Sequence, residues 1–224
     1  MNVDEAIRRI AEVGIVPVVR AATPQQAIRA VEAILAGGIP IVEITMTVPD
    51  AITAIRSVVQ HYGESVLVGA GTVLTSNQAN ACLEAGAEFL VSPGLTPAVM
   101  DCAHSRGKLS IPGALTPSEI MQAVAYGADL IKIFPCGNVG GPKYLKALRG
   151  PFPKISLIPT GGVNASNAAE YLKAGAFALG AGADLVDATA LREGNLGVVT
   201  AAARELVDIV VSTRAQAEQL SAKS

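Results

Sequence analysis

The chain has 224 residues, half of them hydrophobic, and its 17 Lys and Arg residues nearly balance its 19 Asp and Glu residues, so the formal net charge is −2. This length is that of one large domain, and the small net charge excludes the basic surplus that binding to nucleic acid or to an anionic membrane surface requires. The longest charge-free stretch, residues 65–83, is interrupted by glycines and polar residues, so we expect no membrane-spanning segment.

The N-terminus and the cysteines indicate where the protein works. The first residues mix acidic and basic side chains and lack the apolar core of a signal peptide. The three cysteines, Cys82, Cys102 and Cys136, are odd in number and have no C-x-x-C spacing, as unpaired thiols in a reducing compartment do. We therefore expect a cytoplasmic protein.

A repeated unit organises the chain: a helical stretch ends on a glycine, and a short apolar run follows one or two residues later. Glycine suits this place because it adopts the left-handed conformation that closes a helix. At the opposite ends of the helical stretches, threonines offer a hydroxyl that can cap the first turn. The predicted helix-ending glycines are Gly37 or Gly38, Gly86, Gly127 and Gly175, and the capping threonines are Thr23, Thr75, Thr96 and Thr116.

The apolar runs predict eight strands at nearly regular intervals, each separated from the next by enough residues for a helix and two short loops. The runs are continuous rather than alternating, which is typical of a parallel sheet covered on both faces. The predicted strands are residues 15–19, 41–45, 66–70, 89–92, 109–112, 130–134, 155–159 and 177–180.

These strand–helix units predict a single α/β domain over residues 1–224 with a (β/α)8 TIM-barrel fold, a short N-terminal helix and a last helix over residues 196–220. An open doubly wound sheet is the alternative. It is disfavoured because Gly69 with Gly71, and Gly180 with Gly182, lack the third glycine of the dinucleotide-binding fingerprint.

Two charged residues lie inside predicted strands: Lys132 in the sixth and Glu43 in the second. A buried charge is costly unless it is paired, so these residues either form an ion pair, or face solvent in another register, or serve a function. A lysine buried among apolar side chains loses some of its preference for the charged form, and a neutral amine can attack a ketone to form a Schiff base. With a glutamate to move protons, this arrangement predicts carbon–carbon bond chemistry through an enamine.

A glycine pair after the seventh strand indicates a phosphate site. The backbone N–H groups of Gly161 and Gly162 can cradle an anion, and Gly182 and Ala183 after the eighth strand supply the other wall. Phosphate commonly binds after the seventh and eighth strands of such barrels. The competing interpretation is that the glycine pair is only a tight turn.

Further candidates end other strands. Arg20 could bind a carboxylate, whereas Thr72 and Thr160 could donate hydrogen bonds to a substrate. With only two histidines and no H-x-H or H-E-x-x-H spacing, we expect no metal and no cofactor. We interpret Cys136, after the sixth strand, as a small packing residue.

Six motifs, in order and over nearly the whole chain, resemble the 2-keto-3-deoxy-6-phosphogluconate and 4-hydroxy-2-oxoglutarate aldolase family. This resemblance implies a (β/α)8 barrel that assembles as a homotrimer and works as a metal-independent class I aldolase. The matching motifs are VEIT at residues 42–45, VGAGTV at 68–73, SPGLT at 92–96, IPG at 111–113, IKIFP at 131–135 and PTGGV at 159–163.

The resemblance also implies roles for single residues. Lys132 would be the Schiff-base lysine and Glu43 the general acid and base. The residues that match the pyruvate-binding part of the family are Arg20, Thr72, Pro93 and Phe134, and those that match its phosphate loop are Gly161 and Gly162.

Two departures from the family pattern concern the substrate. Members that act on phosphogluconate often carry an arginine where this chain has Thr47, and the Gly-Ser that is common after the eighth strand is Gly182-Ala183 here. One cation and one hydroxyl that would hold the substrate are therefore absent, which leaves the identity of the sugar acid open.

We expect reversible cleavage of a 2-keto-3-deoxy-6-phospho sugar acid, of the phosphogluconate type, to pyruvate and glyceraldehyde 3-phosphate through a Schiff base on Lys132. Substrates of the 4-hydroxy-2-oxoglutarate or phosphogalactonate type are alternatives. Two other classes stay open: a phosphate-binding isomerase or epimerase that uses Glu43 as base and Lys132 only as a cation, and a barrel that binds a ligand without turnover. The expected partners are small molecules, the phosphorylated 2-keto acid and pyruvate.

Overall fold

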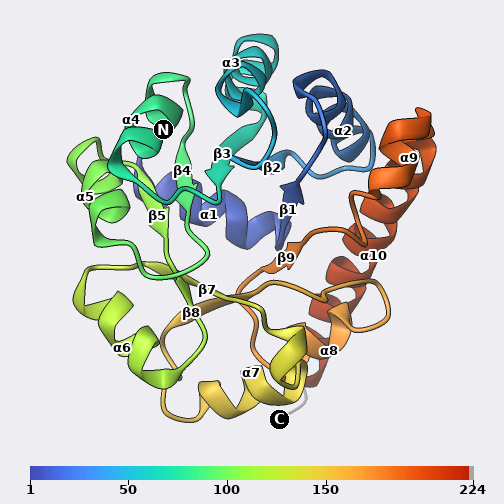
Figure 1. Cartoon of the computed structure of the whole chain (residues 1–224). Coiled ribbons are helices and arrows are strands. Elements are labelled where there is room, and N and C mark those ends of the chain that lie inside the picture. Colours follow the sequence, from blue (N-terminus) through green and yellow to red (C-terminus); the bar gives the residue numbers. More distant parts are fainter. Residues whose placement is uncertain (222–224) are drawn as a thin grey trace.

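The computed structural model describes residues 1–221, in which parallel strands alternate with helices along the chain (Figure 1). The strands are β1 (Ile15–Val19), β2 (Ile41–Thr45), β3 (Leu67–Gly71), β4 (Phe89–Val91), β5 (Leu109–Ile111), β6 (Gly113–Ala114), β7 (Leu130–Ile133), β8 (Ser156–Pro159) and β9 (Leu179–Ala181). The helices are α1 (Val3–Val13), α2 (Pro24–Ala36), α3 (Ala51–Tyr62), α4 (Ser76–Glu84), α5 (Pro97–Ser105), α6 (Pro117–Ala125), α7 (Pro142–Arg149), α8 (Ala168–Lys173), α9 (Ala188–Glu193) and α10 (Leu196–Ser221), with short 3-10 turns at Gly63–Ser65 and Gly137–Val139.

The strands form two parallel sheets, one of six strands in the order β5-β4-β3-β2-β1-β9 and one of three in the order β6-β7-β8. Neighbouring strands are consecutive in the chain, except that β1 pairs with β9 and so brings the first and last strands side by side. The order contains no reversal, which excludes the doubly wound sheet. The result is an α/β fold whose parallel sheet is curled, with the strands gathered at the centre of the molecule, α1 crossing behind them and the other helices around them (Figure 1).

Two connections link the sheets. The extended segment of residues 109–114 pairs with β4 through its first half and with β7 through its second half, because only Pro112 separates β5 from β6. At the other side, an isolated parallel bridge joins Thr160, just after β8, to Gly180 in β9. The side chains of Lys132 and Glu43 therefore come from different sheets but face a shared interior.

The helix caps follow the sequence closely. Thr23, Thr75 and Thr116 each accept a hydrogen bond from the backbone N–H three residues on, and Glu119 completes a reciprocal capping box at Thr116. The backbone N–H donors of Thr116 and Leu115 lower the pKa of Glu119. The predicted glycines Gly38, Gly86, Gly127 and Gly175 all have positive φ. Thr96 differs, because its side chain makes no capping bond to α5.

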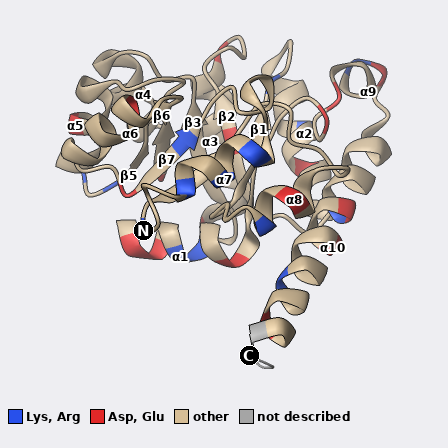
Figure 2. Ribbon diagram, turned by 90° about the horizontal axis from the view of Figure 1, so that it is seen from below, with Lys and Arg blue, Asp and Glu red and all other residues tan. Residues whose placement is uncertain are grey.

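Several boundaries differ from the sequence-based expectation. The strand predicted over residues 109–112 ends at Ile111, a further strand, β6, follows Pro112, and the strand predicted from residue 177 begins at Leu179. The short helix α9 was not expected; Asp187 begins it by accepting a hydrogen bond from the N–H of Ala190. The last helix, α10, agrees with the predicted span, and its C-terminal turns extend away from the other helices (Figure 2). Across residues 1–221, none of the helices has the length and apolar character of a membrane span.

Two glycines in β3 make room inside the curl for larger side chains. A Cβ on Gly69 would clash with the ring of Phe89, and a Cβ on Gly71 would clash with Oε1 of Glu43. The register explains both contacts, since β3 pairs Gly69 with Phe89 and Gly71 with Thr45, two residues beyond Glu43. The Gly69-Ala-Gly71 sequence is thus a steric requirement of this interior.

The contact between Thr160 and Gly180 yields a first test of the fold. A Cβ on Gly180 would clash with Oγ1 of Thr160, so we expect Gly180→Ala to lower the free energy of unfolding by about 1–3 kcal/mol, measured by urea denaturation. Gly197→Ala is the matched control, because a Cβ there would come no closer than 3.8 Å to Oδ1 of Asn195. Unchanged stability of Gly180→Ala would contradict this tight junction between β8 and β9.

Candidate active site

Lys132 and Glu43 are buried side by side in the interior of the curled sheet. Nζ of Lys132 lies 3.7 Å from Oε1 of Glu43, and the two residues are only 4% and 2% exposed. This excludes the register in which they would face solvent. The separation is longer than a hydrogen bond, and Oε1 of Glu43 has no hydrogen-bond partner among the described residues. A buried carboxylate oxygen is therefore available to a third group.

The backbone fixes both side chains at the centres of paired strands. Glu43 lies between β1 and β3, where it pairs with Val18 and Gly69. Lys132 lies between β6 and β8, where it pairs with Gly113 and Ile158. Parallel pairing on both sides therefore fixes the backbone from which each of the two side chains extends.

The ion pair borders a small inner cavity. Its volume of about 10 Å³ is close to the least that can hold one water molecule. The cavity is lined mostly by apolar side chains from the surrounding strands: Val16, Glu43, Val91, Ile111, Lys132, Ile158, Thr160 and Gly180. Apolar surroundings of this kind strengthen the electrostatic interaction between the Lys132–Glu43 pair and any group that enters the cavity.

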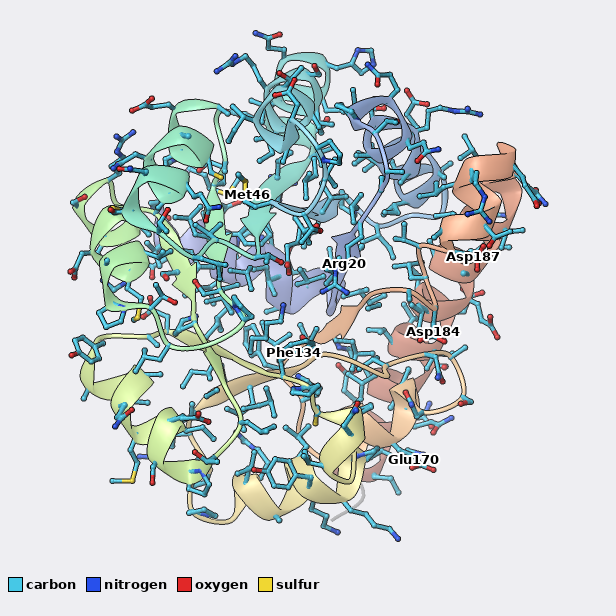
Figure 3. The ribbon with its side chains drawn as sticks, in the orientation of Figure 1. Arg20, Met46, Phe134, Glu170, Asp184 and Asp187 are labelled. Atoms are coloured by element: carbon cyan, nitrogen blue, oxygen red, sulfur yellow. The ribbon has the colours of Figure 1, made fainter. Side chains whose placement is uncertain are left out.

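A larger outer cavity of about 170 Å³ lies next to the inner one, and Thr160 lines both. The structure brings most of the predicted site residues together there. The lining consists of Val18, Arg20, Phe134, Thr160, Gly161, Gly162, Gly182, Ala183 and Asp184. The ring of Phe134 also lies close to the inner pair, with its centroid 5.2 Å from Nζ of Lys132. Figure 3 shows Arg20 and Phe134 near the centre of the molecule and Asp184 farther out, between β9 and α10.

The glycine loops of the outer cavity present backbone donors. Gly161 and Gly162 have φ of +88° and +79°, a conformation that turns successive N–H groups toward one side. Their carbonyls are engaged, by the N–H of Gly137 and the side chain of Asn167. Their N–H groups, and those of Gly182 and Ala183, donate to no acceptor in the described part of the chain. This edge of the cavity has the chemistry of an anion site.

Three residues singled out from the sequence lie at the same edge of the sheet but line neither cavity. Thr72 and Pro93 follow β3 and β4 and are half-buried, and Thr72 has an unusual φ of 55°. Thr47, after β2, is exposed, and its hydroxyl lies 2.7 Å from that of Thr45. The structure therefore does not bring these residues into the walls of the site.

The thiols near the site are buried. Cys136 is fully buried, and its burial raises the pKa of its thiol to about 11, while burial raises the pKa of Cys82 to about 12. Thiols held in the neutral form are poor nucleophiles, so the geometry favours a packing role for Cys136. Within residues 1–221, no three or more His, Cys, Asp and Glu side chains cluster so as to hold a metal ion.

Sequence reasoning missed two residues of this site. Asp184 lines the outer cavity as its single acidic side chain, and Gly71 leaves the space that the Glu43 carboxylate occupies. The signal for Asp184 was its place directly after the Gly182-Ala183 turn, at the end of a strand. No comparable signal marked Gly71, because its role depends on the register between β2 and β3.

Comparisons with known proteins agree with this geometry. The family model of KDPG and KHG aldolases matches residues 5–202. A KHG/KDPG aldolase of Escherichia coli K12 is 38% identical over 87% of this chain and 91% of its own length. A 2-dehydro-3-deoxy-6-phosphogalactonate aldolase of the same organism is 35% identical over 76% of this chain and 83% of its own length.

A solved structure is also similar: KDPG aldolase of Legionella pneumophila, with pyruvate captured at low pH as a covalent carbinolamine intermediate. It is 32% identical, covers 90% of this chain with 97% of its own, and has a TM-score of 0.83. The parallel fold, the buried lysine and these relatives define the chain as an aldolase, an enzyme of the lyase class. It belongs to the KDPG and KHG aldolase family.

The space at Gly71 can be tested through activity. Because its Cβ would displace the Glu43 carboxylate, we expect Gly71→Ala to reduce kcat for aldol cleavage by about 100-fold or more while the protein stays folded by circular dichroism. Gly94→Ala, in the loop after β4, is the control, since a Cβ there meets nothing within 4 Å. Full activity of Gly71→Ala would show that the carboxylate position does not matter for turnover.

Proposed function

We propose that this aldolase cleaves a 2-keto-3-deoxy-6-phospho sugar acid, of the phosphogluconate type, to pyruvate and glyceraldehyde 3-phosphate through a Schiff base on Lys132. The observation that carries the proposal is the buried pair of Lys132 and Glu43, with 3.7 Å between amine and carboxylate, beneath a cavity edged by free backbone donors. The lysine supplies the nucleophile and the carboxylate the proton transfers.

The chemistry begins at the amine. Neutral Nζ of Lys132 adds to the C2 ketone to give a carbinolamine, and Glu43 helps water to leave, which gives a protonated imine. Glu43, directly or through a water, then takes the proton of the C4 hydroxyl. The electron pair of the C3–C4 bond moves into the imine as the aldehyde departs, leaving an enamine. Protonation at C3 and addition of water release pyruvate and restore the amine.

The Legionella pneumophila relative supports the first of these steps, because its structure holds pyruvate as a covalent carbinolamine. The shape of the site fits as well. The inner cavity has room for only a small group beside Nζ of Lys132. The rest of the substrate therefore extends past Thr160, which lines both cavities, into the outer cavity.

In this proposal, each predicted binding residue contacts a particular part of the substrate. Arg20 binds the carboxylate, Thr160 hydrogen-bonds near the reacting carbons, and Phe134 packs on the pyruvyl part. Thr72 and Pro93, which follow β3 and β4 at the same edge of the sheet but line neither cavity, contact the pyruvyl part only once substrate is bound. The phosphate binds to backbone N–H groups of Gly161, Gly162, Gly182 and Ala183.

The similar relatives differ in the sugar acid for which they are named. Relatives named for 2-dehydro-3-deoxy-phosphogluconate and for 2-dehydro-3-deoxy-6-phosphogalactonate are 38% and 35% identical to this chain. We favour the phosphogluconate type because several of the similar relatives carry that name. Substrates of the phosphogalactonate and 4-hydroxy-2-oxoglutarate types are the alternatives, and a screen of these acids distinguishes them.

We also propose that the two sheets close into one (β/α)8 barrel that forms a single domain, with residues 222–224 outside the described part. The shared segment of residues 109–114, the bridge between Thr160 and Gly180, and the pairing of β1 with β9 support closure. We further propose a cytoplasmic location, which the three unpaired cysteines Cys82, Cys102 and Cys136 support, because free thiols are typical of a reducing compartment.

A homotrimer is the assembly we propose for this enzyme. Three apolar side chains in and just after α6, Met121, Val124 and Tyr126, are 62%, 44% and 54% exposed, and an exposed apolar group of this kind favours contact with another subunit. We expect sedimentation equilibrium to give three times the mass of the chain. Replacing Met121 and Tyr126 together by Lys would then shift the mass toward that of one chain, and a wild-type monomer would contradict the proposal.

Trapping with borohydride tests the central step. In the presence of pyruvate, we expect reduction to attach a pyruvate-derived group to Lys132, located by intact mass and peptide mapping. Lys132→Ala should remove the adduct and lower cleavage below about one-thousandth of wild-type activity. Lys154→Ala, at an exposed site before β8, should keep both the adduct on Lys132 and the cleavage activity. No adduct on the folded wild-type protein in excess pyruvate would favour the isomerase alternative.

A further inference from the structure

The outer cavity holds two opposite charges that do not pair with each other. Arg20 and Asp184 both line it, and both residues are exposed. No hydrogen bond or ion pair of either side chain occurs in the described part of the chain, although Arg20 lies at the end of β1 and Asp184 just beyond β9. Both groups are therefore available to a bound ligand.

Asp184 lines the same cavity as the four backbone N–H groups that are free to bind an anion. It follows Gly182 and Ala183 directly, and it shares the cavity wall with Gly161 and Gly162. A carboxylate in this lining repels a phosphate dianion bound in the same cavity, because like charges repel even in partly solvated surroundings. Arg20 offsets one unit of charge, so the side chains lining the cavity carry no net positive charge.

The Asp184 carboxylate can instead bind a ligand whose far end carries uncharged hydroxyl groups. An ionised Asp accepts hydrogen bonds from hydroxyl groups and donates none, so it favours a neutral polyol end over an anionic one. The backbone N–H groups serve either end, because they can donate to a phosphate oxygen or to a hydroxyl oxygen. The position of Asp184 thus reduces the advantage of phosphate without blocking the cavity.

We propose that Asp184 is a specificity-determining residue that makes this aldolase accept unphosphorylated 2-keto-3-deoxy sugar acids alongside phosphorylated ones. The inference rests on the proposed aldol cleavage and deepens it by naming the substrate class. The terminal hydroxyl of the unphosphorylated acid donates to Asp184, while its carboxylate end and its ketone bind as in the phosphorylated substrate.

The experiment compares two substrates in one enzyme. We would measure pyruvate release from 2-keto-3-deoxy-6-phosphogluconate and from 2-keto-3-deoxygluconate and take the ratio of the two kcat/KM values. This ratio cancels any change in the lysine chemistry that both substrates share. For Asp184→Asn we expect the ratio to move toward the phosphorylated substrate by about fivefold at low ionic strength, and by less at high ionic strength.

Asp187→Asn is the matched control, because it removes the same charge three residues farther on, at a residue that does not line the cavity. Its oxygen caps α9 by accepting from the N–H of Ala190, and the amide oxygen of Asn can keep that bond. We expect Asp187→Asn to leave the ratio as in the wild type.

The outcomes separate the two proposals. A wild-type enzyme that gives the Lys132 adduct and cleaves substrate, but whose ratio does not change in Asp184→Asn, overturns the role of Asp184 alone. An equal change in Asp187→Asn also overturns it, because the effect would then be a general charge effect. Absence of both adduct and cleavage in the wild type overturns the aldol mechanism and this inference with it.

Discussion

The buried contact between Lys132 and Glu43 is the constraint on which the rest of the interior depends. Removing an ammonium and a carboxylate from water carries a large desolvation penalty, and their attraction offsets it only when both are held in place. Pairing on both sides holds the strands that carry them, and Gly71 leaves the space that the carboxylate needs. At 3.7 Å the contact also leaves Oε1 of Glu43 unbonded, so the pair is open to a reactant.

Much of this arrangement can be predicted from the sequence, because local chemistry determines it. A threonine before a helix, a glycine after it and an apolar run beyond are short-range signals, and the helices capped by Thr23, Thr75 and Thr116 begin where those signals lie. Lys132 and Glu43 are conspicuous for a related reason, since charges inside apolar strands are rare.

What could not be predicted depends on contacts between distant segments. The clash that excludes a side chain at Gly71 exists only in the observed register of β2 and β3, and the division at Pro112 reflects a segment that pairs with different strands on its two sides. The outer cavity is a similar case. Its walls come from the end of β1 and the loops after β8 and β9. Arg20 and Asp184 therefore line one cavity because of the order of the strands in the sheets, and no local sequence pattern indicates it.

The pairing of β1 with β9 has a consequence for how the protein is made. Residues 15–17 lie against residues 179–181, so the second edge of β1 stays uncovered during synthesis until β9, the last strand of the described residues, has been made. Until then that edge has unpaired backbone groups, which are prone to associate with other chains. Arg20 and Gly182 likewise come to line one cavity only at this stage, whereas the strands that pair with those of Glu43 and Lys132 are complete once β8 has been made.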